Sequence, residues 1–233
     1  MSYSVKYEDL VAQFGYGYVD DLAQYQHIVK VWAYTDMQPR TIAGLGEFRK
    51  DSDNYKKLDD LYNNLAAELH KFIVVDPKKN ETDFDEWHKG CGNCFVSDFN
   101  NIIAGHDVDK ISFGKAQKII NVSFKYIYCL KGAEKYQEKF EHCHMVLDRY
   151  TYGEGFYKKE VLPWYNTRNA QCPIDVRNLT SWSNLSYDEY MDIQKHVREF
   201  LDGSSKYCDG NGKKMTPFQV EFYVFDEYMK TLK

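Results

Sequence analysis

The sequence predicts an all-α protein, and three observations support this fold class. Apolar residues recur every three or four positions in several long segments, as on one face of a helix. Helix-start signals precede the last two of these segments, and proline or glycine follows others. The composition is globular, with 43% hydrophobic residues, 28% charged residues and only 5 prolines. We therefore expect one compact helical globular domain over residues 1–233. A division into two lobes stays open, with the functional site between residues 88–150 and the N-terminal helices.

The N-terminal half contains three predicted helices. Residues 19–34 have a helical apolar pattern, and residues 40–48 form a connection after them. Residues 54–74 carry the clearest apolar stripe, which a proline ends. The polar residues 78–85 predict a surface loop. Residues 92–105 then fit a third helix, closed by a glycine.

The C-terminal half is predicted to hold three more helices. Residues 112–130 form a glycine-started, lysine-rich helix, whereas residues 163–184 are rich in loop-forming residues. Residues 186–203 begin with a capping box and end at a glycine. The last helix has Pro217 at its first position. Residues 220–225 also alternate partly like a strand, so a minor β element stays open.

Composition and charge exclude several classes of protein. No run approaches the roughly 18 apolar residues of a membrane span, and the N-terminus lacks the apolar run of a secretion signal. We therefore expect a cytoplasmic protein with no membrane partner, whose 6 cysteines are reduced. The net charge of −5 argues against indiscriminate nucleic-acid binding.

The charge is unevenly distributed along the chain. Residues 108–139 carry 7 basic and 3 acidic side chains, whereas the residues before them carry 11 and 18 and those after them 12 and 14. One short basic window therefore lies in an otherwise acidic protein. Such a window is the electrostatic signature of contact with a nucleic acid or another polyanion.

The basic window contains the helix predicted over residues 112–130. Its apolar residues can share one buried face, while Lys115, Lys118 and Lys125 project elsewhere. Gly114, before the first turn, lets another backbone approach closely. Because a helix N-terminus exposes unpaired N–H groups with a partial positive charge, this end favours a phosphate contact. The alternative is a buried helix with a solvated lysine face.

Two short motifs in this region resemble a known enzyme family. The run Phe113-Gly114-Lys115-Ala116-Gln117-Lys118 is followed by an apolar helix and then by Met145-Val146-Leu147-Asp148-Arg149-Tyr150. Over about residues 108–152 this order is similar to the core of helix-hairpin-helix DNA glycosylases. The sequence departs from the family at Ala116, where a second hairpin glycine is usual, and in an insertion over residues 132–141.

The resemblance implies a role for each matching residue. Lys118 corresponds to the lysine that attacks the sugar in bifunctional members, or else contacts a phosphate. Asp148 corresponds to the essential carboxylate, although Asp175 lies in a similar stretch and stays an alternative. The implied contacts with DNA are Gly114, Lys115, Gln117, Lys125 and Arg149.

These residue types suit cleavage of an N-glycosidic bond. The reaction builds positive charge on the sugar, and a nearby carboxylate stabilises that charge. A lysine close to other cations has a lowered pKa and can form a Schiff base. Tyrosines, of which the chain has 20, can stack on an extruded base.

A group of sulfur and nitrogen donors suggests a second kind of site. The donors come from two regions of the chain, and four of them would complete a tetrahedral zinc site that joins these regions. The alternative is that the cysteines are reduced and structural. Apart from zinc, we expect no cofactor. The candidate ligands are His88, Cys91, Cys94, His142, Cys143 and His144.

Two hypotheses for the function follow. The first is a DNA glycosylase-like enzyme that removes a damaged or modified base, in repair or in phage–host conflict, with DNA as its partner. The second is a non-enzymatic helical binding protein or inhibitor, of phage or mobile-element type, that acts on a protein or nucleotide ligand. The basic window favours the first hypothesis, and the net acidity favours the second.

Overall fold

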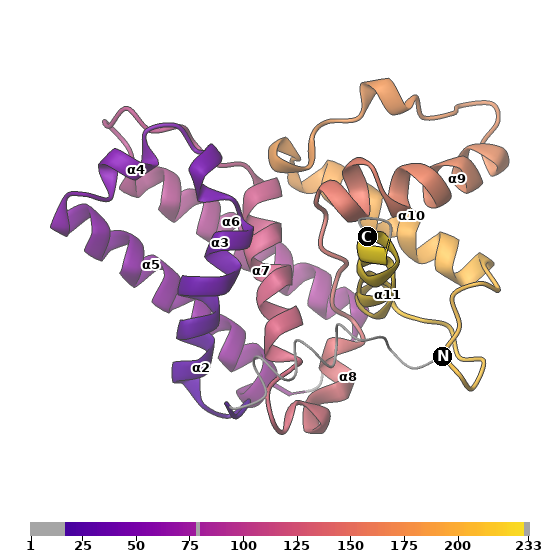
Figure 1. The fold of residues 1–233 in the computed structure, drawn as a ribbon, viewed down its shortest axis with the longest axis horizontal. Coiled ribbons are helices and arrows are strands. Elements are labelled where there is room, and N and C mark those ends of the chain that lie inside the picture. Colours follow the sequence, from indigo (N-terminus) through magenta and orange to yellow (C-terminus); the bar gives the residue numbers. More distant parts are fainter. Residues whose placement is uncertain (1–16, 78–79, 231–233) are drawn as a thin grey trace.

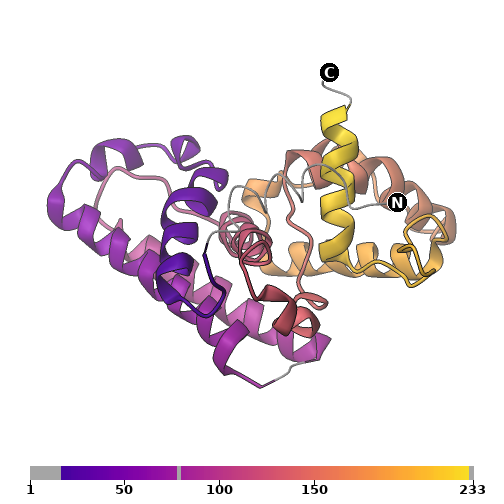
Figure 2. The same ribbon diagram turned by 60° about the horizontal axis from the view of Figure 1, so that its bottom comes forward.

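The all-α prediction is confirmed by the computed structural model, which describes residues 17–77 and 80–230. Within these ranges, β structure is limited to isolated bridges between Tyr18 and Lys131 and between Cys208 and Lys214. Figure 1 shows the other helices grouped on two sides of α7 (Phe113–Ile127), which crosses the middle of the molecule. The turned view in Figure 2 keeps the two groups apart.

The first group is built on a long antiparallel pair of helices, α5 (Ser52–His70) and α6 (Glu81–Ile102). The shorter α2 packs on α5, and η1, the helical segment that follows α2, packs on α7. Both contacts bring the N-terminal residues against the middle of the molecule. The remaining elements of this group are α2 Leu22–His27, η1 Ile28–Ala33, α3 Tyr34–Asp36, η2 Pro39–Thr41, α4 Leu45–Phe48 and η3 Lys71–Val75.

The second group follows α7 in the sequence, and its longest helices are α10 (Tyr187–Gly203) and α11 (Pro217–Lys230). These two helices contact each other, and α10 also contacts α7. The other elements after α7 are η4 Ala133–Tyr136, α8 Gln137–Phe140, η5 Arg149–Gly153, η6 Tyr157–Val161, α9 Leu162–Arg168, η7 Val176–Asn178 and η8 Trp182–Asn184.

Buried apolar side chains form two clusters, one centred on each group, and the first cluster also takes in residues of α8 and α11. The first includes Phe72 and Phe84, and the second includes Tyr157 and Phe200. We call the two groups the N-terminal lobe and the C-terminal lobe. Helix α7 contributes side chains to both clusters, and so do the segment 143–147 and α11, so these three elements join the lobes.

Three predicted elements need correction. Residues 81–85 belong to α6 and not to a loop, because Asn80 and Asp83 form a capping box that starts the helix earlier; residues 78–79 lie outside the described ranges. A helix, α9, extends through residue 168 and so covers the start of the region predicted as loop-rich. Residues 220–225 are helical, because the cap at Thr216 and Pro217 continues into α11.

Helix α7 is enclosed by the protein. Every residue from Phe113 to Lys125 is buried, and Lys115, Lys118 and Lys125 are only 6%, 6% and 8% exposed. The alternative of a solvated lysine face is therefore wrong. Because a buried ammonium group without partners is costly, the surroundings of these three lysines largely define the site described below.

A chain of buried hydrogen bonds joins the two lobes across α7. His88 Nε2 donates to Asn121 Oδ1 (2.9 Å), and Asn121 Nδ2 donates to the Tyr190 hydroxyl (2.9 Å). That hydroxyl donates to His144 Nδ1 (2.7 Å), and His144 Nε2 donates to Asp85 (2.7 Å). Because His144 accepts at Nδ1 and donates at Nε2, this direction of donation requires His144 to be neutral.

The pKa values of the groups in this chain of hydrogen bonds agree with neutral histidines. Burial lowers the pKa of His144 to about 4 and holds the pKa of His88 well below its usual value. Burial alone would raise the pKa of Asp85, but hydrogen bonds from Arg198 and His144 outweigh it and lower the pKa. Asp85 therefore stays ionised and pairs with Arg198 at 2.7 Å.

We expect the protein to lose stability in mild acid. The folded-state pKa of His144 is about 4, against an ordinary value of 6.5, so below pH 6.5 the unfolded chain binds a proton that the folded chain does not. His144 alone should lower the free energy of unfolding by about 2 kcal/mol between pH 8 and pH 5. His88, whose pKa is also lowered, acts in the same direction.

Urea denaturation at a series of pH values measures this dependence. His144→Gln should flatten it, whereas the matched change of exposed His106 to glutamine should leave it as in the wild type. A free energy of unfolding that stays constant between pH 8 and pH 5 would contradict the assignment of neutral, buried histidines.

Candidate functional site

A cavity of about 440 Å³ lies between the two lobes, bounded by α7, α11, the end of α3 with η2, and the segment that precedes η5. Its volume falls in the range of small-molecule sites. The aromatic side chains at its wall are Tyr126, Tyr150 and Phe225. The ionisable side chains at its wall, apart from tyrosine, are Asp36, Arg40, Lys118, Lys125, Asp148 and Glu221.

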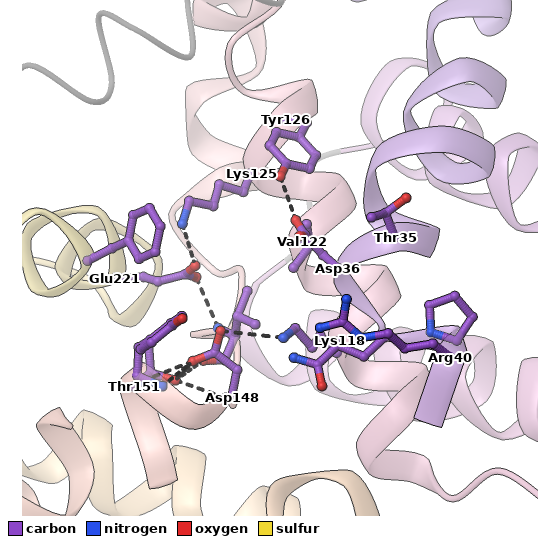
Figure 3. Close-up of a pocket in the computed structure, with 15 residues that line it drawn as sticks. Thr35, Asp36, Arg40, Lys118, Val122, Lys125, Tyr126, Asp148, Thr151 and Glu221 are labelled. Carbon is purple, nitrogen blue, oxygen red and sulfur yellow. Dashed lines mark hydrogen bonds and ion pairs between the residues drawn. The ribbon is translucent and has the colours of Figure 1, made fainter. Parts of the chain in front are cut away.

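The structure brings Lys118 and Asp148 together at this cavity (Figure 3). Lys118 Nζ lies 3.6 Å from Asp148 Oδ2, and the two side chains are 7% and 16% exposed. The ammonium group also lies 4.6 Å from the centre of the Trp182 ring. An amine and a carboxylate thus face one partly enclosed space, shielded from bulk water on the side of the indole.

Asp148 is held in place by the backbone that follows it. Its Oδ1 accepts hydrogen bonds from the N–H groups of Tyr150 (2.7 Å) and Thr151 (3.0 Å), so it is the N-cap of η5. Its other oxygen, Oδ2, faces Lys118. The cap fixes the side chain, so Oδ2 is available for chemistry at a defined position.

The extended segment 145–147 leads the chain to Asp148, and side chains take the place of a neighbouring strand. Gln194 exchanges two hydrogen bonds with the backbone of Met145 (2.7 and 3.3 Å), and Gln117 does so with Leu147 (2.7 and 3.2 Å). Gln117 is fully buried, so its predicted contact with DNA is wrong. It contributes instead to the position of Asp148.

Lys125 and Glu221 form a second ion pair at the cavity, with Nζ and Oε1 at 2.9 Å. Glu221 Oε2 also accepts the N–H of Val146 at 3.0 Å. Burial raises the pKa of Glu221, against the opposing effect of Lys125. The ammonium of Lys125 lies 4.5 Å from the ring of Phe225. Lys125 therefore binds α11 to α7, and because Glu221 pairs with its charge, the DNA contact stays a prediction for it.

Gly114 does not contact DNA in this arrangement, because the segment 182–185 covers it. The N–H of Gly114 donates to Leu185 O (3.0 Å), and Ser112 Oγ donates to Ser183 O (2.6 Å). A Cβ atom on Gly114 would lie 2.0 Å from Trp182 O. The glycine does allow a close backbone approach, as the sequence suggested, but the partner is this chain.

Lys115 is also buried and does not line the cavity, so nothing in this arrangement supports the DNA contact predicted for it. Its ammonium donates to Met37 O (2.9 Å), Gln38 O (3.2 Å) and Thr41 Oγ1 (2.6 Å). Burial, and then the charge of Lys118, lower the pKa of Lys115 to about 8. Lys115 thus fastens the turn between α3 and η2 to α7.

Arg149 and Asp175 lie outside the cavity. Arg149 is exposed and pairs with Glu154 at 3.1 Å, so a contact with DNA stays a prediction for it. Asp175 caps η7 and pairs with Arg177 at 2.6 Å in a different part of the C-terminal lobe. Of the two aspartates that the sequence left open, Asp148 is the one beside Lys118.

The residues predicted as zinc ligands do not converge. His88 and His144 take part in the buried chain of hydrogen bonds described above. Cys91 and Cys94 line a separate hollow between α5 and α6. In the described part of the chain, no three His, Cys, Asp or Glu side chains are arranged to hold a metal ion. The predicted zinc site is therefore not formed by His88, Cys91, Cys94, His142, Cys143 and His144.

Sequence reasoning missed four residues of the site: Asp36, Arg40, Trp182 and Glu221. Glu221 could have been predicted from the sequence, because a lone carboxylate in an otherwise apolar helical run requires a buried cation. The others could not, because they come from elements far from α7 in the sequence. Asp36, for example, accepts a hydrogen bond of 2.5 Å from the hydroxyl of Tyr126, 90 residues away.

Comparisons with protein-family models, curated proteins and solved structures found no match to this chain. Among the helices that the structure describes, none has the length and apolar character needed to cross a bilayer. The function therefore has to be argued from the cavity itself.

Proposed function

We propose that the protein is a DNA glycosylase-like enzyme that cleaves the N-glycosidic bond of a damaged or modified base. The observation that carries the proposal is the pairing of Lys118 and Asp148, with 3.6 Å between Nζ and Oδ2, at the wall of a cavity between two lobes. An amine nucleophile and a fixed carboxylate are the groups that this reaction requires.

In the proposed reaction, the extruded nucleotide places its C1′ atom next to Lys118. The ammonium of Lys118 first gives a proton to water, and a bond from the free amine to C1′ then replaces the bond from C1′ to the base nitrogen. The base leaves with the bonding electrons and takes up a proton, while the alkylated amine gives up a second proton to water. The carboxylate of Asp148 stabilises the positive charge that develops on the sugar. Tyr126, Tyr150 and Phe225 supply aromatic surface for the extruded base.

One observation favours the non-enzymatic alternative, a helical protein that binds a protein or nucleotide ligand. Lys115, Lys118 and Lys125 are buried, so much of the positive charge expected on the surface is neutralised within the protein. A cavity whose lysines are already paired with carboxylates can bind a nucleotide without chemistry. The enzymatic proposal is preferred because Lys118 and Asp148 both line the cavity and lie farther apart, at 3.6 Å, than the Lys125–Glu221 pair at 2.9 Å.

Incubation with labelled duplexes that carry a panel of modified bases tests the proposal. The wild type should produce abasic sites, visible as alkali-labile strand breaks, and borohydride should trap a covalent protein–DNA adduct. Lys118→Gln should abolish the adduct, whereas Lys110→Gln, a matched change at an exposed lysine of the same basic window, should preserve it. Adduct formation by the Lys118 variant would rule out that nucleophile. No abasic product on any duplex would favour the binding protein.

A further inference from the structure

Arg40 differs from the other cations of the cavity. Lys118 and Lys125 face carboxylates at 3.6 and 2.9 Å, whereas Arg40 has no carboxylate partner among residues 17–77 and 80–230. Its side chain is exposed and extends from η2 into the space that Lys118 also faces (Figure 3). A guanidinium in such a position is available to an anion from outside the protein.

The turn that carries Arg40 is held rigidly. Gln38, the residue before η2, has φ of 59°, and it is the single non-glycine residue with positive φ in the described ranges. Such a conformation costs free energy and persists where surrounding contacts impose it. Here the contacts come from the Lys115 ammonium, which binds Met37 O, Gln38 O and Thr41 Oγ1.

The hydrogen bonds between Lys115 and this turn also determine which groups face each other across the cavity. Lys115 is one helical turn from Lys118 on α7, so the same helix fixes both the amine and the turn that presents Arg40. The guanidinium comes from the N-terminal lobe, while Asp148 comes from the segment that leads into the C-terminal lobe. A ligand between them therefore meets a cation on one side and the Lys118–Asp148 pair on the other.

We propose that Arg40 binds a phosphodiester group of the substrate strand, next to the nucleotide whose base is removed. This inference rests on the proposed function and adds the group that holds the strand. A guanidinium forms two parallel hydrogen bonds to phosphate oxygens, which fixes the direction of the backbone as well as its position. Arg40 thereby takes the role that the sequence suggested for Gly114 and Lys115, and Lys115 acts as a positioning residue for it.

Binding of a fluorescent duplex, measured by anisotropy over a series of salt concentrations, tests the inference. Arg40→Gln should weaken binding about tenfold and reduce the slope of log affinity against log salt by about one. Arg177→Gln is the matched control, since Arg177 is exposed and pairs with Asp175 away from the cavity. Lys115→Met should weaken binding in the wild-type background but not in the Arg40→Gln background, if Lys115 acts through Arg40.

The outcomes separate the two proposals. If the wild type shows no salt-sensitive binding to the duplex, the proposed function fails. If the wild type binds and Arg40→Gln behaves like Arg177→Gln, the role of Arg40 is overturned and the proposed function survives. A deoxynucleoside monophosphate distinguishes the source of the phosphate: binding of it as tight as that of the duplex, and dependent on Arg40, would overturn the assignment to a strand.

Discussion

Replacement of Asp148 by asparagine is expected to reduce the rate of base removal by about 10²- to 10³-fold. The carboxylate lies 3.6 Å from Lys118 and faces the cavity, where it can stabilise positive charge on the sugar. Asparagine has nearly the same shape but no charge, so the variant removes the electrostatic effect alone. Single-turnover measurement of abasic product on the best duplex gives the rate directly.

The cap formed by Asp148 makes this substitution a sharp test. Asparagine is as good an N-cap as aspartate and can still accept the N–H groups of Tyr150 and Thr151. Alanine cannot, so Asp148→Ala should lose activity and also about 1 kcal/mol of stability. A variant Asp148→Asn with the wild-type rate would show that the carboxylate serves only to start η5.

Local patterns in the sequence were sufficient to predict most of the fold. The helices α5 and α10 have apolar stripes and clear caps, and both signals depend on residues within one or two turns. The start of α6 was missed although its capping box, Asn80 to Asp83, is also local. It lies in a polar stretch that resembles a loop by composition, and in this case the cap determines the structure.

The surroundings of the lysines could not be predicted, because their partners are distant in the sequence. Lys115 binds the carbonyl of Met37, 78 residues away, and Lys125 binds Glu221, 96 residues away. Helical spacing correctly placed these lysines away from the most apolar face of α7. It could not show that the two lobes also cover the face that carries the lysines. This face of α7 is therefore buried in the middle of the molecule.

One contact of the candidate site links two residues that a short motif had singled out. The family resemblance named Lys118 and Asp148, and the structure places these two residues, 30 positions apart in the chain, in contact range. The resemblance extends less well to the DNA contacts. Gly114 and Lys115 are in the expected order in the chain, but the segment 182–185 and the turn at Gln38 occupy their surroundings. Arg40 is then the exposed cation best placed to hold a strand.

Replacement of Gly114 by alanine is expected to destabilise the protein by about 3 kcal/mol. The new Cβ would lie 2.0 Å from Trp182 O and 2.9 Å from the carbonyl carbon of Ser183, both of them backbone atoms. Backbone cannot rotate away as a side chain can, so the segment 182–185 would have to shift and its hydrogen bonds to Ser112 and Gly114 would be lost or lengthened. Urea denaturation followed by circular dichroism measures the change.

Gly90 provides a control with the opposite sign. It also lies within a helix, α6, but a Cβ there meets nothing within 4 Å. Gly90→Ala should therefore stabilise the protein by about 0.5–1 kcal/mol, because alanine restricts the unfolded chain and favours the helix. If both alanine variants had the same stability, the close contact between α7 and the segment 182–185 would be wrong.

The consequence of Gly114→Ala extends to the cavity. Trp182 lies over both Lys115 and Lys118, at 5.0 and 4.6 Å from the ring centre to each Nζ. A shift of the segment would remove the indole that shields the Lys118–Asp148 pair from water, and water weakens the interaction of the two charges. At a temperature where Gly114→Ala is still folded, we therefore expect its rate of base removal to fall, while Gly90→Ala keeps the wild-type rate.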